Sequence, residues 1–235
     1  METKQEGSFM TESPRVVIIG GHGKIALLAA PKLKAKGFAV DALIRNPEHA
    51  SDVEAASANP VVLDIERAGM DELAEVFNGA QAIVFSAGAG GGNPRRTNAV
   101  DFEAATRAIR AAQQSGVKRF VMVSYSRALV DVDNLDPAHS FYPYARAKHD
   151  ADQALRDSDL DYTILGPGTL TLGPATGKVD VADASGKIDG SDPASADTSR
   201  ENVAEAIALV IGKGLLIRQT ANFFDGQTPM EEAWS

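Results

Sequence analysis

A glycine-rich segment near the start of the chain has the composition of a phosphate-binding loop. It reads Gly20-Gly21-His22-Gly23-Lys24-Ile25-Ala26 and directly follows the apolar run Val16–Ile19. Glycine at the first position permits a tight turn, and Gly23 lets a pyrophosphate approach the main chain. The helix expected next would offer unpaired N–H groups and a partial positive charge. Between a strand and a helix, this spacing predicts a dinucleotide site formed by Gly20, Gly21, His22, Gly23, Lys24 and Ile25.

The end of the second expected strand bears on which dinucleotide binds. In NAD-binding domains of this kind an acid at that point binds the ribose 2′-hydroxyl. Here the strand ends Leu43-Ile44-Arg45-Asn46, with a guanidinium in place of the acid. Arginine suits a 2′-phosphate because its planar fork donates two parallel hydrogen bonds. The sequence therefore predicts NADP rather than NAD, and the alternative for Arg45 is a solvated cation at a strand end.

Strands and helices alternate along most of the chain. The expected strands are Val16–Ile19, Phe38–Ile44, Val61–Leu63, Ala82–Phe85, Val117–Ser124, Asp161–Leu165 and Thr220–Phe224. The expected helices are Lys24–Lys36, Met70–Phe77, Thr97–Ser115, Tyr144–Asp157 and Ser199–Ile211. This order implies right-handed crossovers and a parallel sheet covered by helices on both faces. We therefore expect a doubly wound α/β domain of the Rossmann class.

The composition and net charge of the chain exclude some kinds of metal site and disfavour some kinds of partner. The 235 residues are 44% hydrophobic and carry a net charge of −9, and no cysteine is present. Thiolate zinc sites are thereby excluded, no histidine pair has metal-ligand spacing, and an acidic surface disfavours nucleic acid and anionic membranes. No run of eighteen apolar residues exists that could cross a bilayer. We expect a cytoplasmic protein, monomeric or homodimeric, whose partner is a small-molecule substrate and which holds no metal.

Two segments stand outside the alternation. Residues 1–13 are polar and lack the apolar stretch of a signal peptide, so we expect a disordered tail before a single domain at 14–235. Residues 173–199 are rich in Gly, Ser, Asp and Ala. Within them, Gly-Lys-Val-Asp at 177–180 is echoed by Gly-Lys-Ile-Asp at 186–189, which predicts two short edge strands. A loop this long is usually functional or mobile, so the segment is predicted to lie on the substrate side.

Several separate motifs together carry a family resemblance. Besides the glycine loop they are Ile-Arg-Asn-Pro-Glu at 44–48, Val-Leu-Asp at 62–64, Val-Lys-Arg-Phe-Val at 117–121, Tyr-Ala-Arg-Ala-Lys at 144–148, Leu-Asp-Tyr-Thr-Ile at 160–164 and Ser-Arg-Glu-Asn-Val-Ala at 199–204. The chain resembles the atypical short-chain dehydrogenase/reductase group of NAD(P)H-binding proteins, which is related to the NAD-dependent epimerase/dehydratase family. The resemblance implies that Asp64 and Ile65 lie near the adenine, Ser86, Ala87 and Gly88 along the cofactor, and Pro167 and Gly168 near the nicotinamide.

The resemblance also implies catalytic residues. Tyr144 and Lys148 are four residues apart and share one face of a helix, and in the wider superfamily such a pair is catalytic. A tyrosine is a poor acid–base group at neutral pH until a cation stabilises its phenolate. Lys148 would supply that charge and also bind the nicotinamide ribose. The alternative is a packed tyrosine and an exposed lysine on an ordinary helix.

The remaining candidates follow the later strands. A serine at the end of the fifth strand should polarise the substrate, and the chain offers Ser124 as first choice and Ser126 as second, separated by Tyr125. Relatives often carry an arginine before the Pro-Gly pair, where this chain has Gly166. Arg95 and Arg96 could clamp an anionic substrate, although a solvated loop is the favoured interpretation.

Three functions compete at this point. The leading hypothesis is an oxidoreductase that transfers hydride between NADP(H) and a small carbonyl, quinone or flavin-like acceptor. A non-catalytic NADPH-binding redox sensor is the alternative, since it would keep the glycine loop and dispense with tyrosine chemistry. A sugar-nucleotide epimerase or dehydratase is less favoured because the C-terminal part is too short for a full substrate domain.

Overall fold

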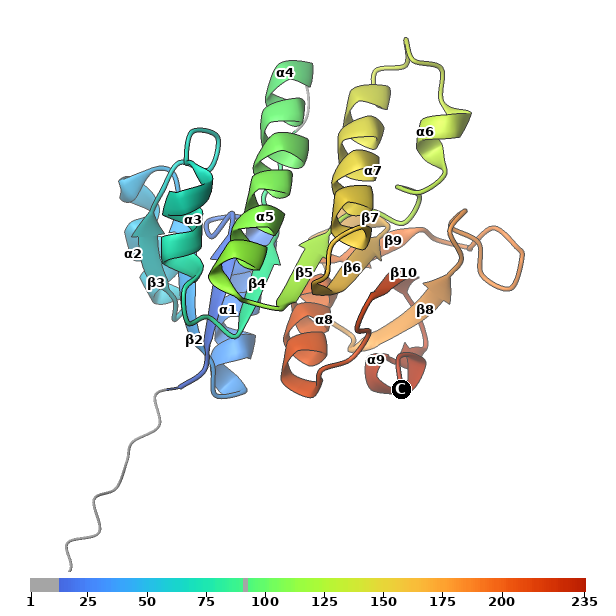
Figure 1. Ribbon diagram of the computed structural model, residues 1–235. Helices are drawn as coiled ribbons and strands as arrows, with labels where there is room; N and C mark the ends of the chain where they lie inside the picture. Colours follow the sequence, from blue (N-terminus) through green and yellow to red (C-terminus); the bar gives the residue numbers. More distant parts are fainter. Residues whose placement is uncertain (1–12, 91–92) are drawn as a thin grey trace, which may run out of the picture.

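A nine-stranded sheet runs through the protein in the computed structural model, which describes residues 13–90 and 93–235 (Figure 1). From one edge to the other its strands are β3 (Asn59–Val62), β2 (Ala39–Ile44), β1 (Arg15–Ile19), β4 (Ala82–Phe85), β5 (Arg119–Val123), β6 (Asp161–Pro167), β10 (Gln219–Asp225), β8 (Lys178–Ala182) and β11 (Thr228–Pro229). The seven strands from β3 to β10 are parallel, and β8 pairs antiparallel with both β10 and β11.

The strand order reverses between β1 and β4. From β1 the chain passes outward to β2 and β3, then returns to β4 on the other side of β1 and continues to β5 and β6. In open α/β sheets this reversal leaves a crevice at the carboxyl ends of the strands, where ligands bind. The fold is thus the doubly wound Rossmann-like arrangement that the alternating pattern predicts.

Helices cover both faces of the sheet (Figure 1). On one face lie α1 (Lys24–Ala35) and α8 (Arg200–Lys213), and on the other lie α3 (Met70–Phe77), α5 (Ala105–Ser115) and α7 (Tyr142–Arg156). Successive residues of β1 serve the two cores in turn: Val16 and Ile18 pack toward α1, and Val17 and Ile19 toward α3 and α5. Because side chains of a strand alternate between faces, a strand buried on both sides must be apolar throughout.

Shorter elements complete the chain. They are η1 (Pro47–His49), α2 (Ala50–Ala55), α4 (Pro94–Thr97), η2 (Asn98–Ala104), α6 (Asp131–Asn134), α9 (Met230–Ala233) and a second small sheet of β7 (Thr169–Thr171) and β9 (Asp197–Ser199). The predicted helix at 97–115 starts earlier, at Pro94, and η2 within it is a π-helix rather than an α-helix. Within the residues that the structure describes, no helix combines the length and apolarity needed to cross a membrane.

The predicted pair of edge strands is half right. Its first copy forms β8, but the second forms a tight turn in which Ile188 makes an isolated bridge to Ser191. Gly186, Asp189 and Gly190 have φ angles of +78°, +48° and +77°, and this left-handed backbone cannot continue a strand. The tail predicted at 1–13 lies outside the described residues except for Ser13, and so do Gly91 and Gly92 of the glycine cluster.

Candidate cofactor and catalytic site

One large cavity, of about 1360 Å³, opens at the carboxyl ends of the central strands where the strand order reverses. Pockets that bind small ligands typically measure about 300–1,000 Å³. This cavity is larger than that range, which leaves room for a dinucleotide and a second small molecule. Its walls contain nearly all the site residues predicted from sequence: Gly20, His22, Gly23, Lys24, Ile25, Arg45, Asp64, Ile65, Ser86, Ala87, Gly88, Ser124, Tyr144 and Lys148.

The glycine loop is packed so closely that a side chain at Gly20 or Gly23 would press against the protein's own main chain. Gly20 has a φ of +85°, and a Cβ there would lie 2.7 Å from the Cα of Ala87. The Gly23 N–H donates to the Gly20 carbonyl over 2.8 Å, which closes the turn, and a Cβ on Gly23 would lie 3.0 Å from that same oxygen. The turn leads directly into α1. A bare main chain at the start of a helix is what a pyrophosphate requires, so these residues fit the phosphates of a dinucleotide.

Three predicted residues do not line the cavity, and each has a packing position instead. Gly21 lies against β2, where a Cβ would be 2.6 Å from the Cβ of Ala42. Pro167 ends β6, and its carbonyl accepts from the Ser126 N–H over 2.9 Å. Gly168 packs where a Cβ would collide with the carbonyl of Ala196. Close approach of backbone to backbone accounts for both glycines.

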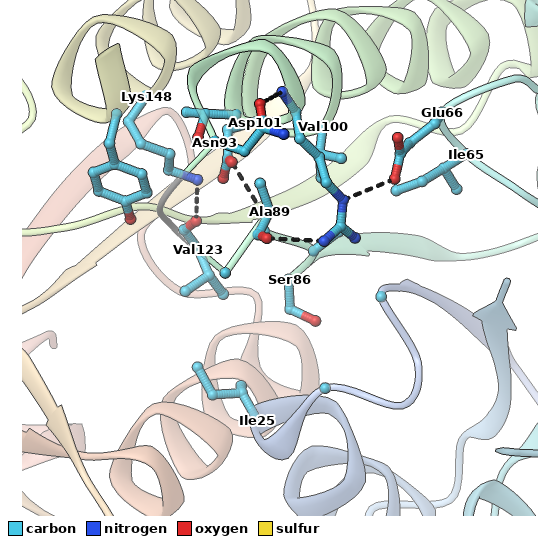
Figure 2. A pocket seen from close by; sticks show the side chains of 18 of the residues that line it. Ile25, Ile65, Glu66, Ser86, Ala89, Asn93, Val100, Asp101, Val123 and Lys148 are labelled. Carbon is cyan, nitrogen blue, oxygen red and sulfur yellow. Dashed lines mark hydrogen bonds and ion pairs between the residues drawn. The ribbon is translucent and has the colours of Figure 1, made fainter. Parts of the chain in front are cut away.

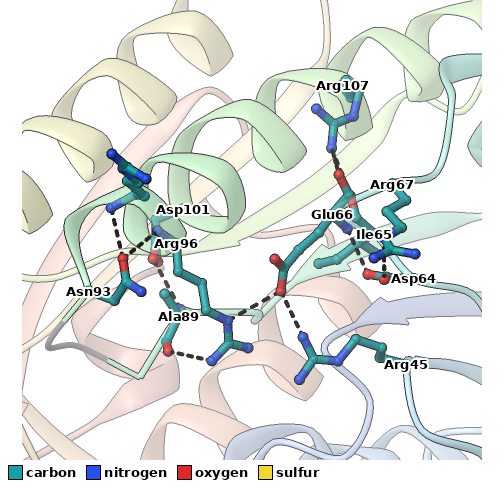
Figure 3. A network of polar contacts seen from close by, with 11 residues as sticks. Arg45, Asp64, Ile65, Glu66, Arg67, Ala89, Asn93, Arg96, Asp101 and Arg107 are labelled. Carbon is teal, nitrogen blue, oxygen red and sulfur yellow. Dashed lines mark hydrogen bonds and ion pairs between the residues drawn. The ribbon is translucent and has the colours of Figure 1, made fainter.

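Arg45 is already engaged by a carboxylate. Its guanidinium donates to Oε1 of Glu66 over 2.9 Å, and Nε of Arg96 donates to the same oxygen over 3.2 Å (Figure 3). Arg96 also donates to the Ala89 carbonyl over 3.1 Å. Glu66 and Arg96 both line the cavity. Glu66 was not predicted from the sequence, although it directly follows the predicted adenine-contacting residues Asp64 and Ile65.

A second cluster of polar side chains lies beside the glycine loop. The rings of His22 and His49 stack with their centroids 3.7 Å apart, and Nε2 of His22 lies 2.8 Å from Oδ2 of Asp52. Both histidines line the cavity. His22, predicted as a residue of the phosphate-binding loop, is therefore held in place by a stacked ring on one side and a carboxylate on the other.

Tyr144 lines the cavity next to Tyr125, which follows β5, whereas Arg45 follows β2, three strands away in the sheet. The Tyr144 ring packs against those of Phe141 and Tyr125, with centroids 5.2 and 5.5 Å away. Burial raises the pKa of the Tyr144 hydroxyl, and the carboxylates of Asp101 and Asp152 raise it further. The phenol therefore stays protonated through the neutral range, as a proton donor must.

Lys148 is buried beside this tyrosine on α7, with 2% of its surface exposed. Its ammonium donates to the Val123 carbonyl over 2.7 Å (Figure 2). In the same view Ile25, at the start of α1, lies across the pocket from Lys148 and Asp101. The lysine is thus fixed at the end of β5, on the wall of the cavity rather than in solvent.

Of the two serines that the sequence offered, Ser124 lines the cavity and Ser126 does not. The hydroxyl of Ser124 donates to Oδ2 of Asp152 over 2.6 Å. Asp152 is 1% exposed and its other oxygen has no partner among the described residues. Burial raises the pKa of Asp152, while Lys148 and Ser124 oppose that shift. Asp152 was not foreseen, although it lies four residues after Lys148 on the same helix face.

Asp101 is a further acid in the site that was not predicted from the sequence. It belongs to the π-helix η2, is 1% exposed, and accepts from the Ala89 N–H over 3.1 Å. Burial raises the pKa of Asp101, and Lys148 and Arg96 oppose the shift. π-helical turns often occur at functional sites, and here the turn contributes both Val100 and Asp101 to the wall of the cavity.

The cavity is also lined by residues 137–141, Pro143, Leu170 and Arg200. No residue of the segment 173–199 lines the cavity. Among residues 13–90 and 93–235, no group of three His, Asp or Glu side chains is arranged to hold a metal ion.

Fold and site together define a class: a Rossmann-like domain with a dinucleotide-sized cavity that begins at a glycine loop and ends at a tyrosine–lysine pair. Residues 20–213 match the model of the family described as NAD(P)H-binding, and the chain belongs to that family. This establishes the domain as an NAD(P)H-binding one, in agreement with the resemblance inferred from the motifs.

Individual relatives are similar over nearly the full chain. An uncharacterized sugar epimerase, YhfK, of Bacillus subtilis is 33% identical over 93% of this chain and 98% of its own. A structure provisionally described as an NAD-dependent epimerase/dehydratase of Bacillus halodurans is 32% identical, covers 94% of this chain and 98% of its own, and has a TM-score of 0.81. The oxidoreductase ylbE of Lactococcus lactis is 26% identical over 93% and 94% of the two chains, with a TM-score of 0.79.

Proposed function

We propose that the protein is an NAD(P)H-dependent oxidoreductase that uses NADPH to reduce a small carbonyl, quinone or flavin-like acceptor. The observation that carries this proposal is the single cavity that joins the glycine loop to Tyr144, Lys148 and Ser124. The phosphate-binding end and the proton-donating end thus belong to one continuous site. The description of a relative as an oxidoreductase agrees with this proposal.

The cofactor end is assigned to Gly20, Gly23 and Lys24 for the pyrophosphate, and to Arg45 and Arg96 for a 2′-phosphate. Two guanidiniums around one position give an anion charge-assisted hydrogen bonds from both sides. Asp64 and Ile65 would lie along the adenine, and Ser86, Ala87 and Gly88 along the middle of the dinucleotide. When bound, NADPH supplies the hydride.

The proton comes from the opposite end. When a carbonyl carbon gains a hydride, the carbonyl oxygen gains negative charge and must be protonated. The Tyr144 hydroxyl gives that proton and then recovers one from water, so that the carbonyl becomes an alcohol and the reduced cofactor is oxidised. Lys148 holds the nicotinamide ribose and stabilises the transient phenolate. Ser124 contacts the carbonyl oxygen and orients it.

Replacing Tyr144 by phenylalanine tests the proposal. Removing a positioned acid costs about 10²–10⁴ in rate, so Tyr144→Phe should depress kcat on carbonyl substrates and leave the Kd for NADPH nearly unchanged. Lys148→Ala should lower kcat and also weaken NADPH binding, because that lysine is proposed to bind the ribose and to stabilise the phenolate. NADPH binding is measured by fluorescence titration, and turnover on separate panels of carbonyls and of quinones and flavins. Full carbonyl activity in Tyr144→Phe would contradict the tyrosine mechanism.

A redox sensor without catalysis is the second candidate. Ser124 already donates its hydrogen to Asp152 and Lys148 donates to Val123, so two of the three catalytic candidates have internal partners. A sensor would bind NADPH and turn over no member of either panel. Adding a nucleotide sugar to the panels tests for sugar epimerase activity, which is the activity named in the description of the Bacillus subtilis relative.

A further inference from the structure

Glu66 occupies the donors that a 2′-phosphate would need. Its Oε1 accepts from both Arg45 and Arg96, whereas no hydrogen bond reaches its Oε2 from the described residues (Figure 3). A quarter of the Glu66 side chain is exposed, and the residue lines the cavity. One carboxylate oxygen is therefore shared by two cations, and the other remains available to a ligand.

The main chain under Glu66 is fixed, so the side chain is the part that can move. The guanidinium of Arg107 donates to the Ile65 carbonyl over 2.8 Å and to the Glu66 carbonyl over 3.3 Å. The Glu66 N–H donates to Oδ1 of Asp64 over 3.1 Å. The carbonyl of Glu66 is thus held by Arg107 of α5 and its N–H by Asp64, while its carboxylate reaches the cavity.

The two forms of the cofactor make opposite demands on this carboxylate. A ribose 2′-hydroxyl is a hydrogen-bond donor, and an acid is its usual partner in dinucleotide-binding folds. A 2′-phosphate is an anion that is repelled by Glu66 and attracted by Arg45 and Arg96. It can use both guanidiniums fully only after Glu66 has released them.

We infer that Glu66 sets the choice between NADH and NADPH. Its unpaired oxygen accepts a hydrogen bond from the 2′-hydroxyl of NADH, and its carboxylate competes with the 2′-phosphate of NADPH for Arg45 and Arg96. The acid that other NAD-binding folds carry at the end of the second strand is supplied here from the loop after β3, opposite an arginine. The inference rests on the proposed function only in requiring that this cavity takes NAD(P)H.

Titration of Glu66→Gln with NADPH and NADH tests the inference. The amide keeps the size of the side chain and removes its charge, so the Kd for NADPH should fall at least tenfold. The Kd for NADH should rise a few fold, because a neutral amide is a weaker acceptor for the 2′-hydroxyl. The matched control is Glu72→Gln, which removes a charge from α3 outside the cavity, where Glu72 accepts from the Gly69 N–H. It should leave the ratio of the two Kd values unchanged.

Adenosine 2′-monophosphate and adenosine 5′-monophosphate, used as inhibitors of NADPH binding, localise the effect. Glu66→Gln should tighten the binding of adenosine 2′-monophosphate by a similar factor and leave the binding of adenosine 5′-monophosphate unchanged. Adding Arg45→Ala to Glu66→Gln should abolish this gain in affinity for the 2′-monophosphate. An unchanged NADPH-to-NADH ratio in a folded Glu66→Gln variant overturns the inference while leaving the proposed function standing. Failure of the wild-type protein to bind either dinucleotide overturns both.

Discussion

Lys148, Asp101 and Asp152 are three buried ionisable groups around Tyr144, and each is at most 2% exposed. Lys148 and Asp101 line the cavity, and Asp152 contacts Ser124 of its wall. A buried acid without a cation would be neutral. Lys148 lowers the pKa of both acids against the larger effect of burial. Its own ammonium is anchored by the Val123 carbonyl. The protonation states of the groups around Tyr144 therefore depend on all three of Lys148, Asp101 and Asp152 together, and not on Lys148 alone.

The pH profile of reduction should follow the raised pKa of Tyr144. In the proposed mechanism the protonated phenol is the active form, so the Tyr144-dependent rate should be full below its pKa and lost above it. An ordinary tyrosine titrates near 10, and burial together with Asp101 and Asp152 moves this one higher. We expect kcat/KM, which reports groups of the free enzyme, to show no loss assignable to Tyr144 up to about pH 10.

Spectrophotometric titration checks the same point without turnover. The absorbance change of tyrosine ionisation in the wild type and in Tyr144→Phe should coincide below pH 10 and separate only above it. An ionisation below pH 9 that disappears in Tyr144→Phe would show that the phenol is activated in the free protein, and would favour Tyr144 as a base.

Single residues were predictable where a local backbone rule demands their type or where a family motif contains them. Gly20 and Gly23 follow from the strand–turn–helix setting, and Tyr144 and Lys148 were singled out by the family resemblance. Glu66 and Asp152 were not foreseen because their importance lies in partners distant along the chain. Glu66 meets Arg96 across 30 residues, and Asp152 meets Ser124 across 28. An acid beside a motif is ordinary in a sequence, and only the fold shows what it contacts.

At the scale of elements, the glycine loop is coupled to β4. Gly20 at the end of β1 lies directly on Ala87, which follows β4. The Ser86 N–H donates to the Ile19 carbonyl over 3.0 Å, which continues the pairing of the two strands. The turn that would hold the phosphates therefore takes its shape from a strand pair rather than from the loop alone.

Gly20→Ala tests that coupling, with Gly37→Ala as its matched control. Both glycines have left-handed backbone, with φ of +85° and +90°, but a Cβ at Gly37 meets nothing within 4 Å. Gly37→Ala should cost about 1–2 kcal/mol of stability, because an L-residue is strained at a left-handed φ, and leave NADPH binding unchanged. Gly20→Ala carries the same strain plus the contact with Ala87, so it should cost about 1–3 kcal/mol more and weaken NADPH at least tenfold. Chemical denaturation and fluorescence titration measure the two effects, and equal behaviour of the variants would contradict the coupling.

The regular elements were largely predictable from sequence, and the irregular ones were not. Strands buried on both faces give uninterrupted apolar runs, so β1, β4 and β5 were clear from composition. The strands β7 and β9 are three residues each and pair only with one another, and they carry no periodic signal. The turn at 186–189 resembles the start of β8 in sequence, but the two segments have different neighbours in the fold. β8 pairs with β10, whereas the repeat has no neighbouring strand.

At the scale of the whole molecule, the charge that lines the cavity is opposite in sign to the net charge of the chain. The chain carries a net charge of −9, yet the cavity is lined by five cationic side chains and only three acidic ones. The cations are Lys24, Arg45, Arg96, Lys148 and Arg200, and the acids are Asp64, Glu66 and Asp101. A cleft of one sign concentrates ligands of the opposite sign. An acidic protein thus presents a locally positive cavity to an anionic dinucleotide.

Hydrogen exchange should divide the segment 173–199 into parts of different stability. Residues 178–182 form β8 and pair with β10 and β11, so their amides should be protected. Residues 183–196 hold few backbone hydrogen bonds, most of them in the turn around Asp183. Exposed backbone with few apolar contacts opens at low free-energy cost, so this stretch should exchange fastest among the described residues. Mass spectrometry of the free protein measures both parts.

The same measurement with NADPH locates the role of this stretch. Because no residue of 173–199 lines the cavity, the cofactor alone should protect the glycine loop and residues 86–90 and leave 183–196 exchanging as before. Protection of 183–196 should appear only when an acceptor is added to the NADP-bound protein, if the segment covers the substrate. Strong protection of 183–196 in the free protein, or its appearance with NADPH alone, would contradict this division between the cofactor wall and the substrate side.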